Sequence, residues 1–266
     1  MFSFLCDQRS ETPINRLYED PFFCLYGYAR SNETQQHNDV GQDYLIFKID
    51  DRSCAFVLCD GVSLSFCGDI AARFLSHKLM DWLKVFHLKD LQDKDVMKER
   101  LEAYLHDIVD EATELVDKKT LPPSMPVLLK DVLEEKRKQG SEAMFVCGRV
   151  DMLSPVANEA NVFLAWAGDS RIRLWDQEEE ITNLLGHDLN SNQRWSTKRG
   201  LVNGGLQTFV SSDVDNCIDH LAVYSDGFQV IDQFKTIPSA EFLPYYMSKS
   251  LDSPASDDIS FLELLW

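Results

Sequence analysis

The chain has 266 residues, of which 44% are hydrophobic and 26% are charged. This composition supplies a large core and lacks the signature of disorder, so we expect a single domain over residues 1–266. The 44 acidic and 26 basic residues give a formal charge of −18, which disfavours nucleic acid and anionic membranes as partners. No stretch approaches the roughly 20 apolar residues of a membrane helix.

The cysteines and the N-terminal residues both bear on the compartment. The seven cysteines are an odd number without a CxxC pair, which fits reduced thiols better than a disulfide framework. The first residues, MFSFLCDQRSETPINR, lack the basic start and long apolar stretch of a signal peptide. We therefore expect a cytoplasmic protein.

The first half of the chain reads as strands followed by helices. Short runs rich in aromatic and β-branched residues predict strands at 22–28, 44–49 and 55–58. From Gly68, apolar residues recur at helical spacing up to Leu83, which predicts an amphipathic helix of about four turns.

Further helices are predicted at 96–116 and, after a proline-rich break at 121–126, at 127–138. Strands then return, a late helix is predicted at 239–248, and the chain closes on a strand at 259–266. This order favours an α+β fold of layered sheets over a regularly alternating parallel sheet. The strands predicted in the second half are 144–150, 162–166, 172–175, 206–210 and 221–224.

Acidic residues stand at the ends of several apolar runs. They are Asp43 in GQDY, Asp60 in CDGV, Asp226 in SDGF, and Asp257 with Asp258 in SDDIS. A strand that delivers a carboxylate into a glycine turn exposes both the side chain and a backbone carbonyl. Mg²⁺ and Mn²⁺ prefer such oxygen ligands, and no His or Cys cluster at zinc spacing competes. For any single Asp-Gly pair, a plain turn is the more ordinary explanation.

Five short motifs follow one another along the chain: GQDY, VLCDGV before a helix, AGDSR, YSDGF and DDIS. Their order resembles that of the metal-dependent type 2C protein phosphatases, in particular bacterial members. The resemblance spans residue 20 to the end. It implies a four-layer αββα sandwich of two antiparallel β-sheets flanked by helix pairs. It also implies two cations, Mn²⁺ or Mg²⁺, at one edge of the sandwich.

The same resemblance implies roles for individual residues. Asp60 is similar to the ligand that bridges the two cations, and the Gly61 carbonyl to a ligand of one of them. Asp226 and Asp257 are similar to ligands of the other cation. Asp43 is similar to a residue that orients metal-bound waters. Asp258 matches a position often filled by Asn, so we leave it outside the ligand set.

Asp169 in AGDSR resembles a position that helps to hold a weaker third cation in some members. An ordinary turn aspartate that pairs with Arg171 or Arg173 explains it equally well.

The chain departs from the family pattern near the expected substrate. The residues after Gly61 are Val62, Ser63 and Leu64, so the histidine proposed as a general acid in many eukaryotic relatives is missing. Arg30 and His37 are the nearby candidates for binding the substrate phosphate, but a solvated loop is the favoured explanation of His37. Metal-bound waters are the alternative means of holding the phosphate.

The stretch 192–205 is the most basic and glycine-rich part of the chain, and it contains Trp195. In the family, this region lies near the active site and varies with substrate. A surface loop whose tryptophan docks on the core is at least as good an explanation as a flap that binds phosphopeptides.

The resemblance thus implies hydrolysis of phosphoserine and phosphothreonine in proteins by water activated at two cations, with no protein nucleophile. A phosphorylated protein is the expected substrate, and a serine/threonine kinase a further expected partner. The alternative is a pseudophosphatase that binds a phosphoprotein without turnover. Gly168 to Ser170 resemble a serine-hydrolase block, but no histidine follows an aspartate at Asp-x-x-His spacing.

Overall fold

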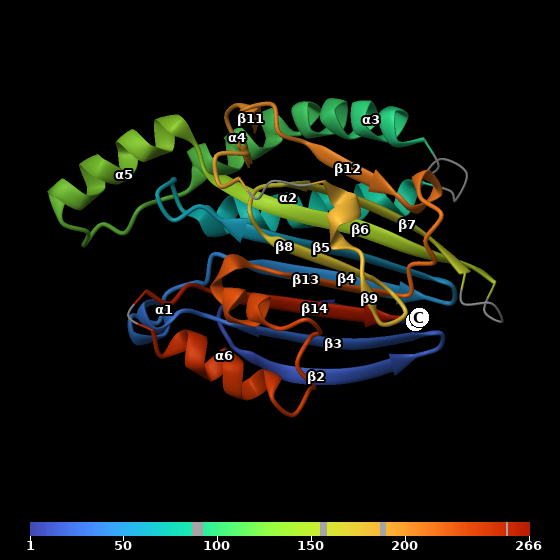
Figure 1. The fold of residues 1–266 in the computed structure, drawn as a ribbon. Helices are drawn as coiled ribbons and strands as arrows, with labels where there is room; N and C mark the ends of the chain where they lie inside the picture. The colour runs from blue at the N-terminus through green and yellow to red at the C-terminus, as the bar shows by residue number, and fades with distance from the viewer. Residues whose placement is uncertain (87–92, 155–158, 187–189, 254) are drawn as a thin grey trace.

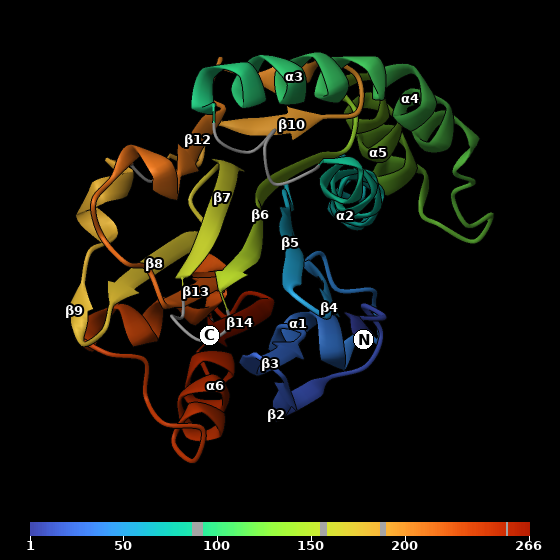
Figure 2. The same ribbon diagram turned by 90° about the vertical axis from the view of Figure 1, so that its right-hand side faces the viewer.

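Two antiparallel β-sheets packed face to face form the centre of the molecule, and helices cover the outer face of each (Figure 1, Figure 2). The computed structural model describes residues 1–86, 93–154, 159–186, 190–253 and 255–266. The order of layers is helix, sheet, sheet, helix, which is the α+β sandwich expected from the sequence.

The first sheet, sheet A, carries the helices α2 to α5 on its outer face (Figure 2). Its strands run in the order β1-β4-β5-β6, and β6 then pairs with β7 along most of its length and with β10 at its start. The strands are β1 (Phe2–Leu5), β4 (Tyr44–Asp50), β5 (Ser53–Gly61), β6 (Glu142–Ser154), β7 (Glu159–Ala167), β10 (Arg194–Ser196), β11 (Gly200–Val202) and β12 (Gln207–Val210).

The second sheet, sheet B, has the strand order β2-β3-β14-β13-β8-β9. Its C-terminal strand β14 lies between β3 and β13, so the end of the chain completes the middle of the sheet. The strands are β2 (Thr12–Glu19), β3 (Phe22–Ala29), β8 (Arg171–Asp176), β9 (Glu179–Glu180), β13 (His220–Tyr224) and β14 (Ile259–Leu265).

Strand β5 shows why the sequence forms these layers. Phe56 and Leu58 belong to the core between the two sheets, whereas Val57 and Cys59 belong to the core under the helices. Because successive side chains of a strand point to opposite faces, a strand buried on both sides reads as a continuous apolar run.

The helices differ between the two sides of the sandwich. On sheet A, α2 packs along β4, β5 and β6, with α3 and α4 beside it, while sheet B is covered by α6 and a 3-10 helix, η4. The helices are α1 (Asn32–Gln36), α2 (Gly68–Val85), α3 (Lys94–Asp107), α4 (Val109–Lys118), α5 (Val127–Gln139), α6 (Leu243–Leu251), η2 (Thr182–Leu185), η3 (Ser211–Asp213) and η4 (Asp226–Gln233).

Two predicted helices have different limits in the structure. The helix expected at 96–116 is divided into α3 and α4 at the buried Ile108, whose ψ of −2° ends α3, and α4 then packs against α2 and α3. The late helix begins at Leu243 and not at residue 239, because Pro244 fits only in the first turn of a helix.

The sequence also left short strands unpredicted. Strands β1 and β2 precede the first predicted strand, and the stretch 192–205 contains a small hairpin, β10 and β11, that extends sheet A. Each of the two hairpin strands has only three residues, too few for an alternating pattern to show in the sequence.

Candidate metal centre

The acidic residues singled out by the sequence lie at one edge of the sandwich, the left-hand edge in Figure 1, where α1 lies. Each stands at a strand end that the antiparallel pairing brings to this edge. Asp43 precedes β4, Asp60 is the next-to-last residue of β5, Asp169 lies between β7 and β8, Asp226 follows β13, and Asp257 and Asp258 precede β14.

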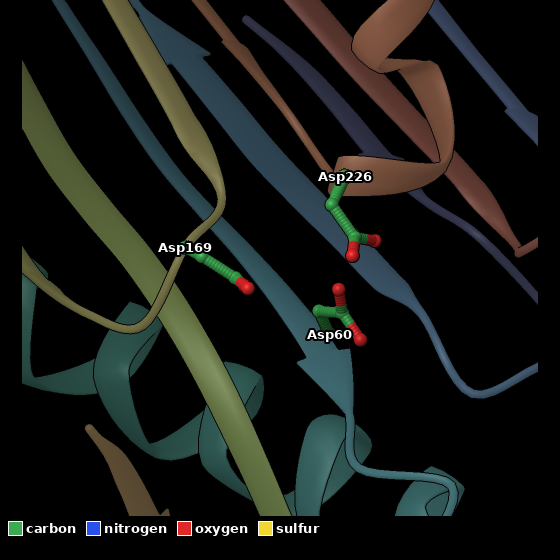
Figure 3. A group of neighbouring side chains, drawn as sticks. All are labelled: Asp60, Asp169 and Asp226. Atoms are coloured by element: carbon green, nitrogen blue, oxygen red, sulfur yellow. The ribbon is translucent and has the colours of Figure 1, made fainter. Parts of the chain in front are cut away.

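Three of these carboxylates form a close group. One oxygen from each of Asp60, Asp169 and Asp226 lies within 4.8 Å of the other two, and Figure 3 shows the three side chains pointing toward one another. Asp60 comes from sheet A, Asp226 from the end of a strand of sheet B, and Asp169 from the loop that links the sheets. The group therefore depends on the packing of the two sheets.

Gly61 fixes the position of Asp60 through close packing. A Cβ on Gly61 would lie 2.6 Å from the carbonyl carbon of Gly68 and 2.8 Å from the Gln42 oxygen, so no larger residue fits. The Gly61 amide also donates to the Gln42 carbonyl at 3.2 Å. The sequence suggested a glycine turn, but Gly61 is the last residue of β5 and has no positive φ.

Gly227 likewise fixes the position of Asp226 through close packing. A Cβ on Gly227 would lie 2.1 Å from the carbonyl oxygen of Asp258, which only glycine allows. This contact holds the start of η4 against the segment that carries Asp257 and Asp258. Both Asp-Gly pairs thus serve the approach of two chain segments, which a plain turn would not require.

Asp258 organises the backbone around the group. Its carboxylate accepts hydrogen bonds from the amides of Ser31, at 2.6 Å, of Gln42 and, at 3.4 Å, of Asp43. The side chain of the buried Gln8 holds the same loop by donating to the Asp43 carbonyl at 3.1 Å. Neither function has a signal in the local sequence, since both depend on contacts between distant segments.

The carboxylates of the group repel one another in a poorly solvated place. Burial, and then the charge of Asp226, raises the pKa of Asp60 well above its usual range. Burial and the charge of Asp60 do the same for the pKa of Asp43, and burial raises the pKa of Asp169 and of Asp226. Such groups are costly as anions unless positive charge is bound between them.

The donor set of this group fits a hard divalent cation. Oδ2 of Asp43 and Oδ1 of Asp169 are buried and accept no hydrogen bond from the described residues. Carboxylate oxygens without partners, held close together, are what Mg²⁺ and Mn²⁺ bind. The residues best placed to hold a cation are therefore Asp60, Asp169 and Asp226.

Asp257 lies at the solvent side of this arrangement and outside the group of three. Its Oδ1 accepts the amide of Asp258 at 2.8 Å, and its charge contributes to the raised pKa of Asp60 and Asp43. It is thus close enough to act on the other carboxylates, and its role as a ligand stays a prediction.

The arginines near Asp169 bind other partners. Arg171 donates from Nη1 to the Asp169 carbonyl oxygen at 2.6 Å, and its Nε pairs with Asp232 at 3.2 Å. Arg173 pairs with Glu180 at 2.6 Å. The Asp169 carboxylate is therefore left facing the group.

Arg30 and His37, considered for phosphate binding, lie nearby on the α1 side of the centre. The guanidinium of Arg30 is buried, pairs with Glu11 at 2.8 Å and donates to the Asp39 carbonyl at 3.0 Å. His37 is the C-cap residue of α1 and is exposed. Neither contact set includes the three grouped carboxylates.

Trp195 in the basic stretch docks on the core. Its side chain is fully buried, stacks on Phe74 at 5.9 Å and donates from Nε1 to the Leu105 carbonyl at 2.9 Å. The hairpin that carries it is therefore a fixed part of sheet A and not a loose loop.

A two-sheet α+β sandwich with a group of carboxylates at one edge that could hold a cation is the arrangement to compare with known proteins. A family model described as protein phosphatase 2C matches residues 30–260. The chain belongs to this family, whose members are metal-dependent serine/threonine protein phosphatases. No curated protein matches the sequence significantly.

Solved structures of bacterial phosphatases share the fold. The serine/threonine phosphatase Stp1 from Staphylococcus aureus is 16% identical with a TM-score of 0.57, and the match covers 96% of this chain and 97% of that one. A bacterial serine phosphatase is 15% identical with a TM-score of 0.56, covering 91% and 96%. RsbX, solved with magnesium, is 11% identical with a TM-score of 0.55, covering 95% and 98%.

In the described part of the chain, the helices are all too short or too polar to cross a membrane.

Proposed function

We propose that this chain hydrolyses phosphoserine and phosphothreonine esters in proteins, using two Mg²⁺ or Mn²⁺ ions. The observation that carries the proposal is the group of Asp60, Asp169 and Asp226, with oxygens within 4.8 Å, in a chain of the protein phosphatase 2C family. The proposed ligands are Asp60, the Gly61 carbonyl, Asp226 and Asp257, with Asp169 toward a weaker third ion.

Bound divalent cations would supply charge neutralisation for the phosphoryl group and would acidify water in the site. The protein's own part is to hold the oxygens in place. Gly61 and Gly227 let the segments approach, and Asp258 fixes the loop that carries Asp43.

Asp43 is proposed to orient the attacking water. Its Oδ2 is buried, has no hydrogen-bond partner among the described residues and lies near Asp60, whose charge raises the pKa of Asp43. A carboxylate oxygen in this position accepts a hydrogen bond from water and holds the water's lone pair toward phosphorus. Arg30 would reach the phosphate only if its pair with Glu11 opened.

The setting proposed for this activity is the cytoplasm, on phosphoproteins made by serine/threonine kinases. All seven cysteines are free, and five of them are buried. Free thiols throughout a chain of this size fit a reducing compartment.

Phosphate release from p-nitrophenyl phosphate and a phosphothreonine peptide, with Mn²⁺, Mg²⁺ or EDTA, tests the proposal. We expect turnover that requires the cation and is lost in Asp60→Asn. Asp51→Asn is a matched control, because Asp51 is exposed in the turn at the opposite end of β5. A folded protein that binds Mn²⁺ but releases no phosphate would be a pseudophosphatase, and the proposal would be wrong.

A further inference from the structure

A cavity of about 220 Å³ lies beside the metal centre, on the same edge of sheet A. We call it the basic pocket. Pockets for drug-sized ligands measure about 300–1,000 Å³, so this smaller cavity suits a single side chain or a phosphate group. It is lined by Leu64, Lys136, Gln139, Glu142, Arg194 and Arg199.

The pocket is joined to the metal centre through neighbouring strands. Gly61 on β5 is paired with Ala143 on β6, and Ala143 is paired with Trp195 on β10. The loop after Gly61 also belongs to both sites, because the Val62 amide donates to the Glu142 carbonyl at 2.9 Å. Two strand spacings separate Gly61 from Trp195, which is about 10 Å.

The charges in the pocket are unequal. Arg194 lies 2.7 Å from Glu142, and Arg199 pairs with the other oxygen of the same carboxylate. Lys136 has no ion pair or hydrogen bond to its side chain in the described part of the chain. Three cations thus face one carboxylate, which leaves an excess of two positive charges in a chain of net charge −18.

The cations stay accessible to a ligand. The Glu142 side chain is only 7% exposed, whereas that of Arg199 is 49% exposed and that of Arg194 is 28% exposed. The Glu142 carboxylate therefore contacts the two guanidinium groups from the buried side of the pocket. Leu64, which is 81% exposed, also lines the pocket and lies in the loop that follows Gly61.

The pocket is built on fixed elements. The hairpin that carries Arg194 and Arg199 is anchored by the buried Trp195. The following residues are tied to α4, because Thr113 donates to the Thr197 carbonyl at 2.6 Å and Lys198 pairs with Asp117 at 2.7 Å. A site on such a support needs little ordering when it binds a ligand.

We propose that the basic pocket binds a second phosphoryl group of the substrate, so that this phosphatase prefers doubly phosphorylated protein segments. This inference rests on the proposed function. A phosphoserine carries about −1.5 to −2 charges at neutral pH, which matches the excess charge of the pocket. Guanidinium groups suit its oxygens because they donate in pairs.

The geometry also sets the spacing of the two phosphates. An extended peptide advances about 3.3 Å per residue, so about three residues cover the roughly 10 Å from Gly61 at the metal centre to β10, the strand that carries Arg194. Leu64 would contact the residues between the two phosphates.

Peptides with one phosphoserine, with a second phosphoserine three residues to either side, or with Asp at that place test the proposal. We expect kcat/KM to be about fivefold higher for one doubly phosphorylated peptide than for the single one, with Asp intermediate. Arg199→Gln and Lys136→Gln should bring this ratio close to one. Arg52→Gln, an equal charge change on an exposed turn at the other end of β5, should leave it unchanged.

A binding experiment tests the basic pocket independently of the proposed hydrolysis. Fluorescence anisotropy of labelled peptides with Asp60→Asn protein in Mg²⁺ reports on the pocket without needing turnover. Tighter binding of the doubly phosphorylated peptide, lost in Asp60→Asn/Arg199→Gln, supports the pocket even if the wild type hydrolyses nothing. Equal binding of both peptides, or a preference that survives Arg199→Gln and Lys136→Gln, would overturn it.

Discussion

Two clusters of charge lie next to each other at one edge of sheet A, and they are built in opposite ways. The metal centre brings together Asp60, Asp169 and Asp226 with no cationic side chain paired to their carboxylates among the described contacts. The basic pocket instead surrounds Glu142 with Arg194 and Arg199. The first cluster gathers like charges without a counter-charge, whereas the second places one carboxylate among cations that outnumber it.

The difference lies in what each cluster costs the folded protein. Buried carboxylates of like charge destabilise the fold until cations neutralise them, as the raised pKa of Asp60 and Asp43 indicates. The basic pocket keeps its cations near solvent and holds them with a carboxylate. The two regions should therefore respond differently to substitution, metal and salt.

The largest effect is expected for loss of the proposed metal ligands. Asp60→Asn and Asp226→Asn should each lower kcat/KM for a phosphothreonine peptide by at least about 100-fold, because each removes charge that holds the same cations. The double variant should lose little more than either single variant, since residues that act as a unit are not additive. Multiplied losses in the double variant would show that the two residues act independently.

A smaller effect is expected for Asp258, which positions the loop that carries Asp43. Asp258→Ala should weaken Mn²⁺ binding about 10- to 100-fold in titration calorimetry, the usual effect of losing a partner behind the ligands. Asp258→Asn keeps one oxygen that accepts backbone amides, so it should recover most of the affinity. If Asp258→Ala binds Mn²⁺ like the wild type, the role of Asp258 is wrong.

The sequence singled out the carboxylates that lie together in the structure but not the residues of the basic pocket, for a physical reason. Asp60 and Asp226 each end an apolar strand and precede a glycine, so the local sequence marks both the strand end and the close approach. The pairing of the strands then brings these ends to one edge. The α+β sandwich was likewise predicted, because its long strands and amphipathic helices have clear periods.

The basic pocket has no such local mark. Lys136 lies in the last turn of α5, Glu142 begins β6, and Arg194 belongs to a three-residue strand whose register with β6 decides where Arg194 lies. The same holds for Asp258 and Gln8, whose hydrogen bonds cross more than 30 positions of the chain. Tertiary packing, and not periodicity, creates these contacts.

Without metal, Asp60→Asn should raise the melting temperature in EDTA at pH 8. Folding raises the pKa of Asp60, so the ionised Asp60 carboxylate destabilises the folded protein at pH values above that raised pKa. The increase in melting temperature of Asp60→Asn over the wild type should therefore shrink as pH falls through the raised pKa.

A gain of a few degrees is expected, since about 1 kcal/mol shifts Tm by about 2–4 °C in a chain of this length. Adding Mn²⁺ at pH 8 should reverse the order, because only the wild type keeps the full ligand set. A variant less stable than the wild type in EDTA at pH 8 would contradict the view that the carboxylates repel one another. Asp51→Asn, at an exposed turn, provides the control.

The smallest effect is expected at the anchor of the basic pocket. Trp195→Phe keeps an aromatic ring against Phe74 but leaves the Leu105 carbonyl without its donor, which should cost about 1 kcal/mol of unfolding free energy. Trp175→Phe is a matched control, because Trp175 is equally buried and its Nε1 has no partner among the described residues. Urea denaturation of both variants measures the difference.

The salt dependence of this loss distinguishes the buried hydrogen bond from the charged contacts of the hairpin. Because the lost hydrogen bond is between neutral groups, the stability difference should be the same at low and high salt. The effect of Arg199→Gln on peptide preference should instead fade as salt is added. A salt-dependent loss for Trp195→Phe would mean that charge, and not the buried tryptophan, holds the hairpin in place.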